Sequence, residues 1–167
     1  MSYYLLIERM QHEIPLLDEI IEKAVNYWET WAKNNDFQEA FTGYVALNLH
    51  GFYTGLEKIF LLVARYMEKK EPSGKNWHNL LLKQISNDVP NIRPALISHI
   101  SAEQLQEYKR FRHVVRNVYT TSLAPQKMSP LIKQLPDLWK KIKTELLDFI
   151  NFLKALQTEM NTLNGSE

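Results

Sequence analysis

The 167-residue sequence contains no cysteine, and this absence removes several classes of site at once. Disulfide frameworks, zinc–thiolate sites, iron–sulfur clusters and cysteine nucleophiles all require a thiol or thiolate. A domain of this length buries roughly 70% of the surface that its unfolded chain exposes, so its core needs neither disulfides nor a structural metal. We therefore expect a cytoplasmic protein without a metal or other cofactor.

Long apolar runs are also missing. The longest, residues 59–64, is far shorter than the roughly 20 residues that a membrane-spanning helix needs. The first ten residues lack the basic start and the small-residue cleavage site of a signal peptide. We expect no signal peptide and no association with a membrane.

Glycine is scarce, with five residues, and no alternating strand pattern bounded by Asn-Gly or Asp-Gly turns occurs. Apolar residues instead recur at steps of three and four, which indicates amphipathic helices. The predicted helices cover residues 4–31, 37–70, 77–85, 101–121 and 131–164. We predict an all-α fold, a single up-and-down helical bundle of about four long helices and one short helix over residues 1–167.

Local signals predict where these helices begin and end. Pro15 predicts a start or a kink in the first helix, and Pro136 is placed near the beginning of the last one. Ser101 with Gln104 three residues later predicts a capping box that opens the fourth helix. The Pro/Ser/Lys-rich residues 122–130 predict a loop.

The last helix carries a continuous apolar stripe from Leu131 to Leu163. Two interpretations are open: the stripe packs in the core, or it binds a partner in a structural helical dimer. Core packing is favoured, because every helix of a bundle needs such a face.

The net charge of +1 argues against a surface devoted as a whole to nucleic acid. Its distribution is uneven, however. Residues 1–40 hold three basic and eight acidic side chains, a net charge of −5, whereas residues 108–144 hold nine basic and one acidic, a net charge of +8. The positive segment could serve an RNA backbone or the acidic face of a partner.

The positive segment begins with Tyr-Lys-Arg-Phe-Arg-His-Val-Val-Arg-Asn-Val-Tyr, residues 108–119. On a helix, His113, Arg116 and Asn117 share one face and Arg112 lies at its margin. Placing these cations together costs helix stability, which invites a functional explanation. Guanidinium groups bind phosphate in bidentate fashion, and an imidazole exchanges protons near neutral pH, so the cluster has the groups needed to cleave an RNA backbone.

A plainer interpretation remains open for each of these residues. Arg112 and Arg116 could pair with an acidic residue (Glu57, Glu103 or Glu107), while His113 is solvated and Tyr119 is core. Elsewhere, His12 beside Glu8 and Glu13 is the nearest approach to a metal site, but a solvated charged face is favoured. His78 is expected to be a surface or packing residue.

The stretch 111–119 resembles the signature helix of the HEPN superfamily, in particular its HepT-like branch. That motif has an arginine, usually followed by a polar residue, then four to six residues, then a histidine, often with a tyrosine two further on. Arg112, His113, Asn117 and Tyr119 occupy these four positions. The order of a long helix around residues 49–59, a short helix at 77–81 and the motif helix also agrees, so that the similarity covers residues 37–123.

The sequence departs from the motif at Asn117, which stands where the family has its catalytic histidine. Asparagine cannot exchange a proton at neutral pH. Either His113 performs the acid/base task, or the chain keeps the fold and binds without cutting.

The resemblance implies a homodimer whose motif helices face each other, and a toxin paired with a nucleotidyltransferase antitoxin that modifies Tyr119. The first hypothesis is a metal-independent endoribonuclease. In it Arg112 and Arg116 clamp phosphate, His113 is the acid/base, and Asn117 and Tyr119 position the RNA, with further substrate contacts from Lys109 and Arg110. The second is a non-catalytic HEPN module that binds RNA, a nucleotide or a nucleotidyltransferase.

Overall fold

The protein is described by a computed structural model over residues 3–30, 37–117 and 123–164. The elements in these ranges are α1 (Tyr4–Thr30), α2 (Gln38–Val63), the π-helical turn η2 (Ala64–Glu68), α3 (Trp77–Ile85), α4 (His99–Asn117) and α5 (Pro125–Asn164). The described residues contain no strand, and their one extended pairing is an isolated bridge between Val89 and Arg93. The predicted all-α fold is confirmed.

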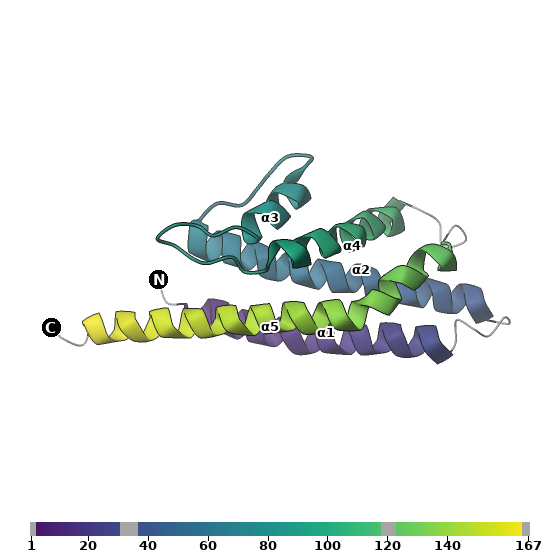
Figure 1. The fold of residues 1–167 in the computed structure, drawn as a ribbon, viewed down its shortest axis with the longest axis horizontal. Helices are drawn as coiled ribbons and strands as arrows, with labels where there is room; N and C mark the ends of the chain where they lie inside the picture. The colour runs from purple at the N-terminus through teal and green to yellow at the C-terminus, as the bar shows by residue number, and fades with distance from the viewer. Residues whose placement is uncertain (1–2, 31–36, 118–122, 165–167) are drawn as a thin grey trace.

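The four long helices run alternately up and down the bundle (Figure 1). Helix α2 packs against α1 and α4, and α5 packs against α1 and α4. The short α3 lies outside the four long helices, against α2 and α4. The residue before α1 contacts α5: the backbone N–H of Tyr3 donates to Oε1 of Gln157 at 2.8 Å.

The core is centred on α2, most of whose apolar side chains are buried. The Phe52 ring is met edge-on by Tyr108 of α4 at 5.4 Å and by Trp139 of α5 at 6.1 Å between ring centroids. The Tyr108 hydroxyl donates to the Leu131 carbonyl at 2.8 Å, so this buried polar group is satisfied. These contacts fix α4 and α5 on the same central helix.

The apolar stripe of α5 is core over most of its length. Its buried residues are Leu131, Leu135, Leu138, Ile142, Leu146, Phe149 and Leu153. The stripe then leaves the bundle, and Leu163 is 74% exposed. The core interpretation is therefore confirmed up to Leu153.

The prolines interrupt the helices less than expected. Helix α1 continues through Pro15 instead of beginning there. Pro15 and Gln11 are both exposed, so water can reach the Gln11 carbonyl that loses its helical donor. In α5, Pro130 and Pro136 are likewise exposed and inside the helix, and Figure 1 shows the first turns inclined to the rest.

The predicted loop at residues 122–130 is wrong over its described helical part, because α5 begins at Pro125. Proline is favoured at the first helical position, where its missing N–H would have no intrahelical partner. Met128 is fully buried, and its burial favours the additional turn over a loop.

The predicted capping box at Ser101 is also wrong, because α4 begins two residues earlier, at His99. Oγ of Ser98 accepts the Ser101 N–H at 3.2 Å, as an N-cap does. The Ser98 N–H donates to Glu145 of α5 at 3.1 Å. A carboxylate from another helix thus takes the place of the expected acid or amide within the box.

Helix α2 ends in a wider turn than the sequence predicts. The turn η2 follows Val63, and Lys69 closes it with a left-handed φ of 53°. The turn includes Glu68, whose Oε1 forms an ion pair with Nη2 of Arg93 at 2.5 Å. The Arg93 side chain is fully buried and also donates to the carbonyl of Gln84 in α3 and to those of Asn87 and Pro94 between α3 and α4. The pair attaches that segment to the end of α2.

Gly55 sets how closely α1 approaches α2. A Cβ at position 55 would lie 2.7 Å from Cδ2 of the buried Leu17, whereas a Cβ at Gly43 would meet nothing within 4 Å. Both Gly→Ala replacements gain about 0.5–1 kcal/mol of helix propensity, but Gly55→Ala must also displace Leu17, at about 1–3 kcal/mol. In urea unfolding we expect Gly55→Ala to be less stable than Gly43→Ala by that second amount. Equal stabilities would contradict the close approach.

Two arginine–glutamate pairs of different burial provide a second test. Arg93→Ala leaves Glu68 without its buried partner, and we expect a loss of about 3–5 kcal/mol in the free energy of unfolding. Arg65, 56% exposed and paired with Glu71 at 2.6 Å, is the matched control, for which Arg65→Ala should cost about 1 kcal/mol or less. Similar losses would show that burial of the Arg93–Glu68 pair does not determine how much it contributes to the free energy of unfolding.

Candidate functional site

An open groove of about 640 Å³ lies between α3 and α4. Its lining residues are Lys75, Asn76, His78, Asn79, Lys109, Arg110, Arg112, His113, Val114, Arg116 and Asn117. These include five lysine and arginine side chains, two histidines and no carboxylate. The groove therefore attracts anions.

Six of the seven residues that the sequence singled out line this groove. The seventh, Tyr119, lies outside the described residues, as does the predicted end of the motif helix. The structure adds Lys75, His78 and Asn79, which come from α3 and the segment before it. Helical periodicity could not find these three, because α3 and α4 are brought together only by packing.

Arg112 is turned inward, toward α2. Its Nη2 lies 3.2 Å from Oε1 of Glu57, and its Nε donates to Oγ1 of Thr54 at 3.3 Å. The pairing with Glu57 that the sequence left open is therefore present. By contrast, Arg116 and His113 are exposed, and no ion pair is recorded for either within the described ranges.

The remaining cations of α4 differ in how they are held. Arg110 is exposed and pairs with Glu107 on its own helix. Lys109 donates to Asn79 of α3 and to Gln106. Burial, together with the charge of Arg110, lowers the pKa of Lys109. Lys109 thus ties α4 to α3 while its ammonium remains in the groove wall.

Asn117 lines the groove, but its side chain is hydrogen-bonded to its own helix. Its side-chain amide donates to the carbonyl of His113 at 2.7 Å, one turn earlier on α4. The amide satisfies its own helix, and with no ionisable group it supplies no proton transfer. Any acid/base group must come from elsewhere in the groove.

Glu57 is a buried charge, with 4% of the residue exposed, that contacts two lining residues of this groove. While Oε1 receives Arg112, Oε2 lies 2.5 Å from Nδ1 of His78. The His78 ring also lies against Trp77, with 3.7 Å between centroids. His78 is thus a held groove residue rather than a simple surface or packing residue. One signal was present in the sequence: Glu57 is the one acidic residue between Leu49 and Val63.

The charges of two groove arginines affect the pKa of His50 in α2. Burial lowers the pKa of His50, and the nearby charges of Arg112 and Arg116 lower it further, while Glu57 opposes the shift. These shifts favour the neutral form of His50. Sequence reasoning gave it no role, because its neighbours in space are 62 and 66 positions away along the chain.

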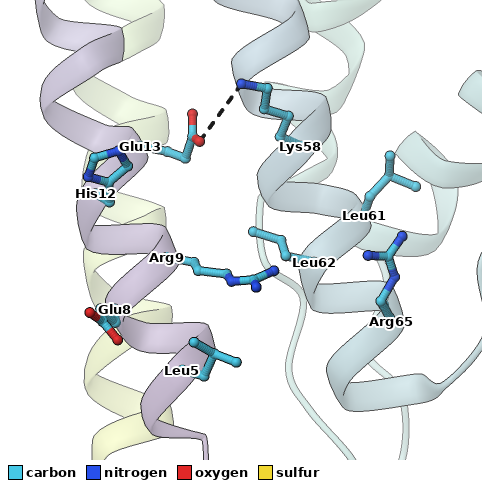
Figure 2. Close-up of a pocket in the computed structure, with 9 residues that line it drawn as sticks. All are labelled: Leu5, Glu8, Arg9, His12, Glu13, Lys58, Leu61, Leu62 and Arg65. Carbon is cyan, nitrogen blue, oxygen red and sulfur yellow. Dashed lines mark ion pairs between the residues drawn. The ribbon is translucent and has the colours of Figure 1, made fainter.

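A second groove, about 700 Å³, lies between α1 and α2 (Figure 2). It carries both signs of charge: Glu13 reaches across to Lys58 at 3.9 Å, and Arg9 lies over the Tyr66 ring at 5.8 Å. Glu8 and His12 point away from α2 in this view. Because its lining includes two carboxylates, this groove is a weaker anion site than the one between α3 and α4.

The described residues contain no group of three or more histidine, aspartate or glutamate side chains placed to hold a metal ion. Within the same ranges, no helix combines the length and the apolar character that crossing a membrane requires.

Comparison with known proteins gives one match. The model of a family described as HepT-like protein matches residues 44–153, a range that includes α3, α4 and most of α2 and α5. No curated protein matches the chain, and no solved structure does. The family match covers the cationic groove and the core helices that support it, and the chain belongs to the HepT-like family of the HEPN superfamily.

Proposed function

We propose that the groove between α3 and α4 binds RNA along its phosphate backbone and cleaves it without a metal ion, as a ribonuclease toxin does. The observation that carries this proposal is the lining: five cations and two imidazoles, with no carboxylate among them. A carboxylate-free lining favours a polyanion over a neutral or cationic ligand.

The reaction that fits these groups is transesterification at phosphorus. A 2′-hydroxyl loses its proton and attacks the adjacent phosphate, whose added charge needs cationic or hydrogen-bonding partners. Arg116 is the main phosphate clamp. It is exposed, and it forms no ion pair with the residues that the structure describes. Lys109, Arg110 and Arg112 also line the groove, although Arg110 is paired with Glu107 and Arg112 with Glu57.

The proton must be moved by an imidazole of the groove, because Asn117 cannot do so. His113 is the residue that the motif helix offers, one turn before Asn117 and exposed to the groove. Tyr119 would position the RNA or receive a modification from a nucleotidyltransferase antitoxin. The same proposal includes a homodimer in which two such grooves face each other. An RNA strand between them would contact the cations of both protomers.

The second candidate is a HEPN module that binds RNA, a nucleotide or a nucleotidyltransferase without turnover. Two contacts favour it: the amide of Asn117 is used on its own helix, and Arg112 is paired with Glu57 at 3.2 Å. Both contacts reduce the groups free to act on a substrate. Where the ligand is RNA, the two candidates share the groove and differ only in turnover.

The central test is RNA cleavage by the purified protein in EDTA. We expect shortened products with 2′,3′-cyclic phosphate ends, because the attacking group is the neighbouring 2′-hydroxyl. A 2′-deoxy strand of the same sequence should bind but stay intact, which separates cleavage from contaminating nucleases that cut DNA. Intact RNA that is still bound would favour the non-catalytic module, and absence of RNA binding would contradict the ribonuclease and the RNA-binding form of the module.

Arg116→Ala supplies the matched charge variant for that test. Loss of one phosphate contact should weaken RNA binding and reduce the slope of log affinity against log salt by about one. Lys154→Ala removes the same charge from an exposed position on α5 outside the groove and should leave the slope unchanged. Equal effects of the two variants would show that general charge, not the groove, attracts RNA.

RNA binding should also raise the pKa of His50, because the charges of Arg112 and Arg116 are among the causes that lower it and bound phosphates offset them. Affinity should then increase as the pH falls through the range where His50 titrates, since the complex holds the proton more tightly. Proton NMR titration with a 2′-O-methyl oligonucleotide measures this shift, and His50→Gln assigns the signal. A pKa that stays the same or falls on binding would place the RNA elsewhere.

A further inference from the structure

Glu57 and His78 form a dyad whose geometry resembles an acid/base pair more than a structural ion pair. The carboxylate is 4% exposed, so it has little access to water, and each of its oxygens has an assigned partner. Oε2 meets Nδ1 of His78 at 2.5 Å, while Oε1 meets Arg112 at 3.2 Å. Glu57 is thereby fixed on the side of His78 away from solvent.

The contact with Glu57 determines which ring nitrogen of His78 is available. A carboxylate accepts hydrogen bonds but does not donate them, so the proton of neutral His78 lies on Nδ1. The lone pair is then on Nε2, at the other end of the ring. The ring is held in this orientation by Trp77, at 3.7 Å between centroids with 30° between planes.

His78 is also accessible to a substrate. Its side chain is 25% exposed and lines the groove, together with Lys75, Lys109 and Arg116. With Nδ1 bound to the buried carboxylate, Nε2 is the ring nitrogen left for a substrate. His78 thus combines a fixed tautomer, a charged partner behind it and a cationic surface beside it.

His113 lacks this arrangement. It is exposed on α4, and none of the described contacts holds either of its ring nitrogens. A general base acts most effectively when its orientation and tautomer are already set before the substrate arrives. Of the two imidazoles in the groove, His78 is the one whose ring is held in place before a substrate arrives.

We propose that His78 is the general base of the RNA cleavage assigned to this groove, with Glu57 as its positioning residue, and this rests on the proposed function. Nε2 of His78 takes the proton of the 2′-hydroxyl as the 2′-oxygen forms its bond to phosphorus. The bond from phosphorus to the 5′-oxygen breaks, and the leaving oxygen takes a proton from water. The product ends are a 2′,3′-cyclic phosphate and a 5′-hydroxyl, and the proton on His78 returns to solvent.

His78→Asn is the discriminating variant, since the asparagine amide can still donate to Glu57 from the position of Nδ1 but has no counterpart of Nε2. We expect the cleavage rate to fall about 100-fold or more, while RNA affinity stays within about twofold and the melting temperature is retained. The acid limb of the pH–rate profile should disappear. His99→Asn, an exposed histidine outside the groove, is the control with unchanged cleavage, and His113→Asn should lose less than tenfold.

A second measurement does not depend on activity. Long-range proton–nitrogen NMR of the intact protein should show neutral His78 protonated on Nδ1, and Glu57→Gln, which can donate to the ring, should shift the proton toward Nε2. The Nε2–H form in the wild-type protein would overturn the proposal, as would cleavage by His78→Asn at the wild-type rate or a parallel loss of RNA binding. If the wild-type protein neither binds nor cuts RNA, the proposed function fails together with this inference, an outcome distinct from cleavage that persists without His78.

Discussion

The burial of Glu57 is the constraint on which the groove depends. An isolated carboxylate in an apolar helix costs several kcal/mol, as an order of magnitude, unless cations or donors meet it. Here Arg112 comes from α4 and His78 from α3, so one charge on α2 draws both helices toward the same point. The two walls of the groove therefore meet at the same acid.

This pairing also divides the cations of α4 into two groups. Arg112 lies inward, 12% exposed at its side chain, and its charge is balanced by Glu57. Arg116 and His113 face outward, where no acidic side chain lines the groove. Repulsion among neighbouring cations weakens the helix, and the tertiary contacts of α4 must offset it. An anionic ligand would relieve that repulsion, so the same arrangement that costs stability in the free protein favours binding of a polyanion.

Most of the fold could be predicted from sequence because it depends on local periodicity. The limits of α3 and the buried stripe of α5 followed directly from apolar residues spaced three and four apart. The start of α4 could not be predicted, since its cap is completed by Glu145 from another helix. For the site, the α4 residues were identified from one charged stretch, whereas His78 was not, because its partner Glu57 is 21 positions away.

The asparagine at position 117 therefore does not by itself decide whether the chain is an enzyme. In a single-helix motif, phosphate binding and proton transfer are both supplied by α4, and losing the histidine removes the second. In this structure the imidazole held by a buried carboxylate comes from α3, while α4 carries the guanidinium groups. Under the proposed assignment, proton transfer and phosphate binding would belong to different helices, joined through Glu57. A change in the motif helix would then spare catalysis as long as the carboxylate still holds both partners.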